Sequence, residues 1–386
     1  MGIIKSILDN DLYKFTMQCA VFILFPSMVV KYKFTDRREL SFPTGFKDLL
    51  VNEINKLSSL KLRGSEEEFL RKKLNNFLPP TYIDFLCGYR FDPSEVRVTQ
   101  DENNKLHIDI EGLWYRTILW EVVLMSIISE LYFISTNQSV DLSQFNESDK
   151  HKGGLLSTHG VNFADFGTRR RYSFENQKRV VGIMKDFNTF VGTSNVYLAY
   201  KYDIKPIGTH AHEWFMAHAA IYGYKMSTTI ALENWVRVFR GMLGIALTDT
   251  LTTGIFWKSF DTMFAKLFDG VRHDSNDPII FGNNAIKHYN SLGIDPLSKT
   301  IVFSDALDHH KSIDIKKYFD GLICTSFGIG TKLTNDVGVE PLNMVIKLRS
   351  VLVNGVWEEC IKLSDDAVKH TGEESEVQLA KTILKL

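Results

Sequence analysis

One local pattern repeats after Gly160: a short apolar segment ends in small polar residues and is followed by residues with helical spacing. These apolar segments are 162–166, 190–191, 204–207, 244–247, 270–271, 300–303, 321–323 and 343–347. Strands that alternate with helices build a parallel sheet, and a long series of such units favours a (β/α) barrel. The units are unevenly spaced, so we expect an irregular barrel over residues 161–349.

The part of the chain before this repeat mixes helix and strand patterns. We expect helices from Leu12, over 49–60 and over 66–78, with Pro79-Pro80 ending the last one, and strands over 29–34, 96–100 and 106–110. The long apolar segment 113–133 then predicts a buried helix. Residues 1–134 thus form one domain in this interpretation. The fold class is α/β: an N-terminal α+β domain plus an irregular (β/α) barrel domain that carries the active site.

Two other segments flank the barrel. Residues 135–160 are polar and contain Gly153-Gly154, so we expect a connector or a mobile insertion. In the tail, 350–386, Asn354-Gly355 predicts a hairpin, and we expect the tail to pack back on the N-terminal domain.

Composition excludes several classes of protein. The formal net charge of −1 argues against a nucleic-acid partner. Arg116, Glu121 and Glu130 interrupt the segment 113–133, which argues against a membrane span. The 4 cysteines are scattered without a CxxC spacing, as expected for buried, reduced thiols in a cytoplasmic protein.

A histidine pair follows the expected strand 204–207. After Gly208-Thr209 come His210 and His212, at the carboxyl end of the strand, where barrel enzymes carry out their chemistry. Two functions fit the pair. His210 and His212 could be zinc ligands of a barrel hydrolase, which needs more ligands from other strand ends. Alternatively, one histidine accepts a phosphoryl group, and Glu213 holds its other ring nitrogen.

Three other strand ends carry groups that suit anions or flat rings. Arg272 with Asp274 and Asp277 suits phosphate, hydroxyls or Mg²⁺, although Asp277 before Pro278 also predicts a helix N-cap. The run 326–332 offers glycine backbone N–H groups, a threonine hydroxyl and Lys332 to an anion. The run 165–171 offers a phenyl face and arginines, of which Arg170 and Arg171 also fit a solvated basic run.

Taken together, the motifs resemble the nicotinate phosphoribosyltransferase family. The matching stretches are 8–17, 111–132, 165–171, 190–195, 206–215, 245–250, 271–278, 301–308 and 326–334. The resemblance implies an N-terminal α/β domain, an irregular barrel and a homodimer with a shared active site. It also implies synthesis of nicotinate mononucleotide and pyrophosphate from nicotinate and 5-phosphoribosyl 1-diphosphate in NAD salvage. In this family the reaction needs Mg²⁺ and is coupled to ATP hydrolysis through a phosphohistidine.

The resemblance also implies roles for individual residues. His212 matches the phosphorylated histidine, and Phe166 and Tyr13 would stack on the two faces of the pyridine ring, Tyr13 from the second subunit. Ser194 stands where the nicotinamide-using relative has an aspartate, which favours the acid as substrate over its rivals nicotinamide and quinolinate. The remaining matches are substrate-binding Thr209, Arg169 and Arg272, ribose-facing Asp274, Mg²⁺-facing Asp277, and Ser304, Asp305, Gly328, Gly330 and Thr331 at the phosphates.

Two positions depart from the family pattern. Asn276 replaces a glycine, and we expect the turn to survive because asparagine tolerates a left-handed backbone better than most residues. The stretch 362–365 matches, but 366–369 then departs from the pattern, which leaves the role of Lys369 open.

Overall fold

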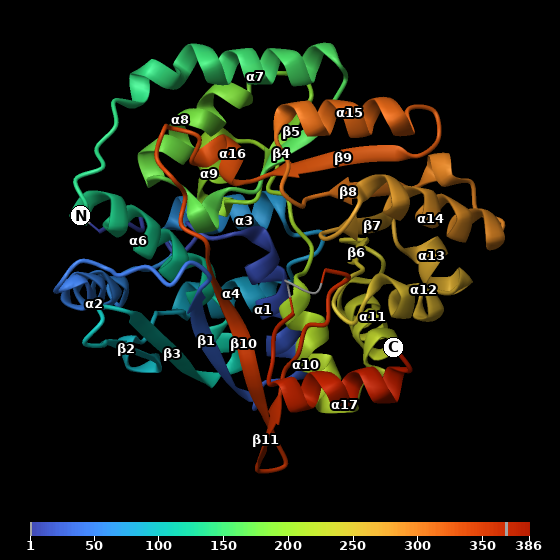
Figure 1. The fold of residues 1–386 in the computed structure, drawn as a ribbon, viewed down its shortest axis with the longest axis horizontal. Helices are drawn as coiled ribbons and strands as arrows, with labels where there is room; N and C mark the ends of the chain where they lie inside the picture. The colour runs from blue at the N-terminus through green and yellow to red at the C-terminus, as the bar shows by residue number, and fades with distance from the viewer. Residues whose placement is uncertain (1, 367–369) are drawn as a thin grey trace.

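The computed structural model describes residues 2–366 and 370–386, so Lys369 lies outside the described residues. Two sheets organise the chain: a 5-stranded sheet with the order β11-β10-β1-β3-β2 and a 6-stranded sheet with the order β5-β4-β9-β8-β7-β6. Figure 1 shows the first sheet at the lower left and the second at the upper right, with helices between and around them. The mixed architecture agrees with an N-terminal domain plus an irregular α/β barrel.

The 5-stranded sheet is antiparallel and joins the two ends of the chain. Its strands are β1 (Val29–Asp36), β2 (Val96–Gln100), β3 (Leu106–Leu113), β10 (Met344–Val353) and β11 (Val356–Glu359). Residues 343–347, expected as the last barrel strand, instead begin β10, which pairs with β1. The reason is visible in β10, where Met344, Ile346 and Leu348 are buried and the residues between them are not. Such alternation suits a sheet with one buried face rather than a fully buried barrel strand.

The 6-stranded sheet is parallel and contains the strands expected from the repeat, with one exception. They are β4 (Phe163–Asp165), β5 (Phe190–Thr193), β6 (Ile245–Leu247), β7 (Gly270–His273), β8 (Thr300–Phe303) and β9 (Cys324–Ile329). The last of these begins later than the expected 321–323, because Gly321 adopts a left-handed backbone in the preceding turn.

The exception is the segment 204–207, which forms no strand. It makes a single bridge, between Thr193 and Pro206, because proline has no N–H with which to extend a ladder. The N–H of Ile207 donates to the carbonyl of Thr193 at 2.8 Å, and the Thr209 hydroxyl donates to the carbonyl of Ile245 at 3.0 Å. The segment therefore spans the gap between the edge strands β5 and β6, which makes the barrel irregular.

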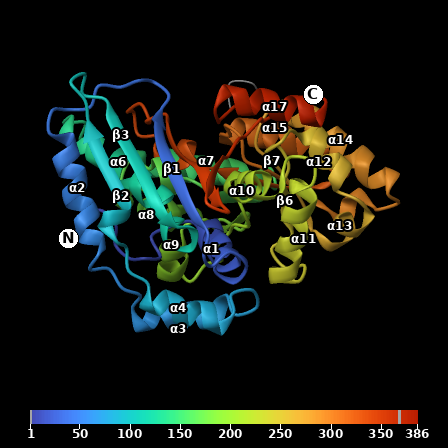
Figure 2. The same cartoon turned by 90° about the horizontal axis from the view of Figure 1, so that it is seen from below.

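Helices fill the space between the sheets and cover the barrel (Figure 2). They are α1 (Leu12–Leu24), α2 (Phe46–Leu57), α3 (Gly64–Lys73), α4 (Pro80–Gly88), α5 (Trp114–Thr117), α6 (Trp120–Ser135), α7 (Asn146–Thr158), α8 (Phe174–Met184), α9 (Val196–Tyr202), α10 (His212–Tyr222), α11 (Ser227–Phe239), α12 (Thr253–Ser259), α13 (Thr262–Leu267), α14 (Pro278–Ser291), α15 (His309–Phe319), α16 (Thr331–Thr334) and α17 (Glu374–Leu384). Short 3₁₀ turns, including η3 (Thr168–Arg170), join some of them.

Two helices differ from the expectation. The helix expected over 66–78 ends at Lys73, and Pro80 begins α4, because proline fits the first turn of a helix. The expected connector 135–160 contains α7, which packs against α8 and α15 and crosses the top of the molecule in Figure 1. Residues 114–135 form a segment long and apolar enough to cross a bilayer. However, 78% of its 18-residue apolar window is buried inside the protein.

The C-terminal tail contacts both the N-terminal sheet and the barrel helices. The hairpin β10–β11 closes at Asn354-Gly355 and extends the N-terminal sheet, whereas α17 packs beside α10 and α12 through Val377, Ala380 and Leu384. Of the cysteines, Cys19 and Cys360 are buried, but Cys324 is exposed, contrary to expectation, and all four are free.

Arg171 ties the N-terminal segment to the barrel. Its guanidinium is fully buried and contacts both carboxylate oxygens of Asp9, at 2.7 and 3.0 Å. Arg171 is therefore not part of a solvated basic run, because a buried charge needs a partner of this kind. The contact holds the chain that leads into α1 against the 3₁₀ turn η3.

Candidate active site

A narrow cavity of about 70 Å³ lies at the barrel end where α1 enters. It is lined by Asp11, Tyr13, Phe166, Arg169, Ser194, Ile207, Gly208, Thr209, Ile245, Arg272 and Val302. The structure thus brings together the predicted ring-binding and arginine residues, along with Thr209 and Ser194. Tyr13 and Phe166 of the same chain both line it, whereas the resemblance implied a Tyr13 from the second subunit.

Gly208 allows α1 to reach the cavity. A Cβ atom on this residue would lie 2.9 Å from the backbone nitrogen of Tyr13 and 3.2 Å from Cβ of Leu12. Any side chain at position 208 would therefore push the start of α1 away. The close approach places Tyr13 beside Thr209, and the Tyr13 hydroxyl oxygen is buried without a hydrogen-bond partner among the described residues.

Gly328 likewise leaves room for a residue that lines the cavity, Phe166. It lies within β9, and a Cβ atom there would come within 2.2 Å of the Phe166 ring. Phe166 follows β4, and its N–H donates to the carbonyl of Ile329 at 2.9 Å. The first glycine of the expected phosphate loop therefore makes room for the phenyl ring that lines the cavity.

We expect Gly328→Ala to displace the Phe166 ring and to raise the KM for the flat-ring substrate. Overpacking of this kind costs about 1–3 kcal/mol, which corresponds to roughly 5- to 150-fold. Steady-state kinetics would measure it. Gly64→Ala is the matched control, because an added methyl group there meets no atom within 4 Å. An unchanged KM would contradict the role given to Gly328.

Asp11 is a cavity residue that the sequence did not single out. The Ser194 hydroxyl donates to its carboxylate at 2.7 Å, and burial raises the pKa of the Asp11 carboxyl above its usual value. The cavity therefore contains a carboxyl group, that of Asp11, although position 194 is a serine. The lining still carries two cations, Arg169 and Arg272, against one carboxyl group, which favours an anionic ligand.

Arg272 links the cavity to a second cluster of charges. Its Nε donates to the Ser304 hydroxyl at 2.9 Å, and its Nη2 lies 3.1 Å from Oδ1 of Asp274. Ser304 also donates to Asp274 at 2.8 Å. Burial alone would raise the pKa of Asp274, but Arg272, His212 and Lys362 hold it well below its usual value. Asp274 is therefore a carboxylate at neutral pH.

His212 lies on the other side of Asp274. Its Nε2 is 3.0 Å from Oδ2 of Asp274 and 3.0 Å from Nζ of Lys362, and its Nδ1 is 3.0 Å from the Thr250 hydroxyl. The expectation that Glu213 holds the second ring nitrogen is wrong. His212 is the first residue of α10, and the next side chain points into the core, where Glu213 is 6% exposed.

The imidazole of His212 is kept neutral. Burial lowers its pKa, and the nearby Lys362 ammonium lowers it further, against the opposing effect of Asp249 and Asp274. A neutral imidazole has the lone pair that a phosphoryl acceptor requires. His212 is thus protonated only at pH values below its ordinary pKa of about 6.5.

This arrangement predicts the direction of a pH shift in Lys362→Met. Removing the ammonium favours the imidazolium form, so the pKa of His212 rises. For any reaction that needs the neutral ring, the pH below which activity falls would then be higher by about one pH unit. The acid limb of the pH–rate profile measures the shift, and Lys362→Arg, which keeps the charge, serves as control. An acid limb at the wild-type pH in Lys362→Met would contradict the assignment.

The side chains His212, Asp249 and Asp274 could also hold a cation, with ligand atoms within 4.8 Å of one another. The Lys362 ammonium, 3.1 Å from Asp249, already lies among them. The expected metal residue Asp277 is elsewhere: it is exposed and caps α14, accepting from the N–H groups of Ile279 and Ile280 at 2.8 and 2.9 Å. Next to Asp277, Asn276 has φ 71°, so the turn keeps its left-handed residue.

A zinc pair of His210 and His212 is not formed. His210 is 1% exposed and packs edge-on against Phe215 and Trp235, with ring centroids at 5.2 and 4.7 Å. Burial lowers its pKa to about 3, as expected for an imidazole in an apolar setting. His210 packs among aromatic rings, whereas His212, at the start of α10, faces Asp274, so the hydrolase alternative loses its metal site.

The expected phosphate-binding residues lie near these groups but not in the cavity lining. Gly330 packs on the carbonyl of Phe166, and Thr331 begins the short helix α16. Asp305 follows Ser304 at the end of β8 and is half-buried.

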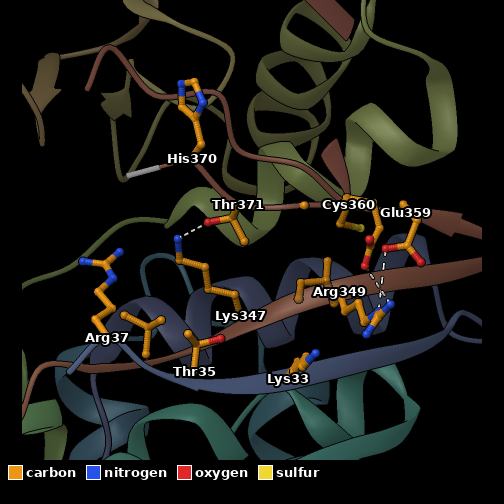
Figure 3. A pocket seen from close by; sticks show the side chains of 13 residues that line it. Lys33, Thr35, Arg37, Lys347, Arg349, Glu359, Cys360, His370 and Thr371 are labelled. Carbon is orange, nitrogen blue, oxygen red and sulfur yellow. Dashed lines mark hydrogen bonds and ion pairs between the residues drawn. The ribbon is translucent and has the colours of Figure 1, made fainter. Parts of the chain in front are cut away.

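A second cavity, of about 270 Å³, opens between β1, β10 and residues 370–373 (Figure 3). Its basic side chains are Lys33, Arg37, Lys347, Arg349 and His370. Among the lining residues that the structure describes, the acidic side chains are Glu359 and Glu373, and both contact Arg349. Burial, together with Lys362 and Arg37, lowers the pKa of Lys347 to about 7. Even with Lys347 partly neutral, the described lining carries more basic than acidic side chains.

Lys362 connects the second cavity to His212. Its backbone pairs with that of Thr371, N–H to carbonyl in both directions at 2.9 Å, and the Thr371 hydroxyl accepts from Lys347 in the cavity wall. The side chain of Lys362 reaches the other way, to His212 and Asp249. Sequence reasoning missed Lys362, Asp249 and Thr250 as site residues, although all three lie in stretches that matched the family.

Known proteins with similar sequences point to one family. Residues 161–385 match the nicotinate phosphoribosyltransferase (NAPRTase) family, and residues 8–129 match its N-terminal domain. The nicotinate phosphoribosyltransferase of Desulforapulum autotrophicum is 50% identical over 379 residues, 97% of each chain. That of Chromohalobacter salexigens is 49% identical over 387 residues, 99% of each chain.

Solved structures agree with the sequence relatives. The crystal structure of nicotinate phosphoribosyltransferase from Porphyromonas gingivalis has a TM-score of 0.97 to this chain at 46% identity and covers 100% of both chains. That from Vibrio cholerae has a TM-score of 0.93 at 35% identity and covers 100% of this chain and 94% of its own.

Proposed function

The chain belongs to the nicotinate phosphoribosyltransferase family, and we propose that it makes nicotinate mononucleotide from nicotinate and 5-phosphoribosyl 1-diphosphate. The pyridine nitrogen attacks C1 of the ribosyl group, the bond from C1 to the diphosphate oxygen breaks, and pyrophosphate leaves. The product would serve NAD biosynthesis by salvage. The observation that carries the proposal is Arg272, which lines the ring-sized cavity and also contacts Asp274, the carboxylate beside His212.

The ring substrate would lie between Tyr13 and Phe166. Aromatic faces hold a pyridine by offset stacking, and Arg169 can hold its carboxylate in a bidentate pair. With Arg169 and Arg272 against Asp11, the lining has a positive balance that nicotinate neutralises and nicotinamide does not. The acid is therefore the favoured substrate, and this argument rests on the two arginines rather than on Ser194.

The diphosphate would lie toward Asp274 and Arg272. A Mg²⁺ ion fits the donor set if Asp249 and Asp274 supply its protein oxygens, since Mg²⁺ prefers carboxylates and substrate phosphates. When bound, Mg²⁺ neutralises charge on the leaving group. The 5-phosphate would lie among Ser304, Asp305, Gly328, Gly330 and Thr331, whereas Asp277 caps α14.

Coupling to ATP would proceed through His212. A neutral ring nitrogen attacks the terminal phosphorus of ATP, the bond from that phosphorus to the bridging oxygen breaks, and ADP leaves; water later takes the phosphoryl group and releases phosphate. The lowered pKa of His212 and the Lys362 ammonium beside it support this step. The basic second cavity, adjoining Lys362, offers charge for a polyphosphate chain that approaches His212.

Four free cysteines suit the reducing cytoplasm, which is where we place the reaction. A homodimer is also proposed, and within one chain Tyr13 already lines the cavity.

Competition between pyridines tests the proposal. Purified protein with Mg²⁺, ATP and labelled 5-phosphoribosyl 1-diphosphate should form a mononucleotide from nicotinate and far less from nicotinamide or quinolinate. In parallel, labelled ATP should leave acid-labile phosphate on His212. Product from nicotinamide at an equal rate, or no product from any of the three, would overturn the assignment.

A further inference from the structure

A buried lysine joins the ring cavity to the helix that begins with His212. Lys14 lies on α1, directly after Tyr13, and its side chain is 0% exposed. Its ammonium contacts two carboxylates from distant parts of the chain, Glu121 on α6 and Glu213 on α10. A buried ammonium between two carboxylates is costly to desolvate and contributes geometric specificity rather than net stability.

One end of this cluster fixes the start of α10. Glu213 follows His212 directly, and besides Lys14 its carboxylate accepts from the Tyr32 hydroxyl and from Nε1 of Trp114, the latter at 2.7 Å. With these partners, Glu213 holds the first turn of α10 against the N-terminal sheet. The direction of the His212 side chain depends on that turn.

The other end reaches the cavity. The second oxygen of Glu121 lies 3.6 Å from Nη1 of Arg169, which lines the cavity. Nζ of Lys14 also lies 5.8 Å from the centre of the Tyr13 ring, another lining residue. The charges alternate from the cavity inward as Arg169, Glu121, Lys14 and Glu213. Burial alone would lower the pKa of Lys14, but Glu121 and Glu213 raise it above its usual value, so the ammonium stays charged.

We propose that Lys14 is a positioning residue that couples occupancy of the ring cavity to the placement of His212. This inference rests on the proposed function. A carboxylate substrate that binds Arg169 competes with Glu121 for the guanidinium, so Glu121 relies more on Lys14, and the hold of Lys14 on Glu213 changes. In the low dielectric of the core such a change is felt along the whole row of charges.

The coupling predicts a specific defect in Lys14→Met. The substitution removes neither His212 nor its direct partners Asp274, Thr250 and Lys362, so ATP hydrolysis persists even though the placement of His212 no longer follows occupancy of the cavity. The number of ATP molecules hydrolysed per nicotinate mononucleotide formed should rise several-fold, and the KM for nicotinate should rise about tenfold, within the range for residues that act through one network. Lys14→Arg, which keeps the charge, should restore most of the coupling.

The control is another buried lysine that bridges two carboxylates. Lys152 is 8% exposed and bridges Asp149 and Asp336, away from both cavities, so Lys152→Met measures the effect of losing such a bridge on folding alone. If Lys14→Met does not fold, Glu121→Gln tests the same idea, because it removes the negative charge between Arg169 and Lys14 and leaves Lys14 paired with Glu213.

The outcomes separate the inference from the function on which it rests. A wild-type protein that hydrolyses no ATP during nicotinate turnover would overturn the proposed function. A wild-type ratio of ATP to product in both Lys14→Met and Glu121→Gln, with normal wild-type turnover, would overturn only the role given to Lys14. A raised ratio in these two variants, and not in Lys152→Met, is the result we expect.

Discussion

His212→Ala is expected to abolish ATP hydrolysis while leaving slow, ATP-independent transfer of the ribosyl group to nicotinate. The variant loses the only atom that can accept the phosphoryl group in this mechanism, so ATP hydrolysis should fall by about 10⁴-fold or more, as for other covalent nucleophiles. Transfer itself depends on the Tyr13–Phe166 cavity and on Arg272, none of which contacts the imidazole. Release of labelled phosphate and formation of nicotinate mononucleotide would be measured side by side.

The matched control is His159→Ala, an exposed histidine at the end of α7 that should change neither rate. Thermal unfolding of both variants would separate loss of chemistry from loss of fold. Retention of ATP hydrolysis in His212→Ala would disprove the phosphohistidine. Complete loss of transfer at saturating substrates would instead show that the imidazole also takes part in ribosyl transfer.

The second large effect is expected for Asp274→Asn. Asp274 is the carboxylate between His212 and Arg272, and it also accepts from Ser304. The amide keeps the size of the side chain but leaves Arg272 and Lys362 without this negative charge, and it removes an oxygen ligand proposed for Mg²⁺. Loss of one preorganised charged group typically lowers kcat by about 10²–10³-fold, and we expect a loss of that size for transfer.

Asp277→Asn is the informative comparison for Asp274→Asn. Asparagine caps helices as well as aspartate does, so the cap of α14 should survive the change. Nearly wild-type activity in Asp277→Asn, with a large loss in Asp274→Asn, would assign the metal-binding carboxylate to Asp274. The opposite pattern would restore the metal role expected for Asp277 from the sequence.

Much of the fold could be predicted from local patterns. The apolar segments that end in small polar residues became β4 to β8, and the strands expected over 96–100 and 106–110 and the hairpin at Asn354-Gly355 also formed. The misassigned segments share a cause. Pro206 blocks a ladder, Pro80 starts a helix, and 343–347 joins a different sheet, and in each case a tertiary partner or a single backbone group outweighed the periodicity.

For the site, the sequence predicted which residues line the cavity better than it predicted which residues contact one another. Tyr13, Phe166, Arg169, Ser194, Thr209 and Arg272 were all singled out and all line one cavity. It missed Asp11, which shares that lining, and Lys362, which stands 150 residues from the imidazole that it contacts. It also predicted that Glu213 contacts the ring of His212, whereas the Glu213 carboxylate binds Lys14, 199 residues away in the chain.

The amino-acid pattern by itself determined the kinds of elements, their order and the residue types at the strand ends, because periodicity and turn chemistry act over a few neighbouring residues. Only the tertiary structure decided which charges meet. Arg171 with Asp9, Lys14 with two glutamates, and Lys362 with His212 are pairs between segments far apart in the chain, and their energies depend on burial and distance, which no local pattern encodes.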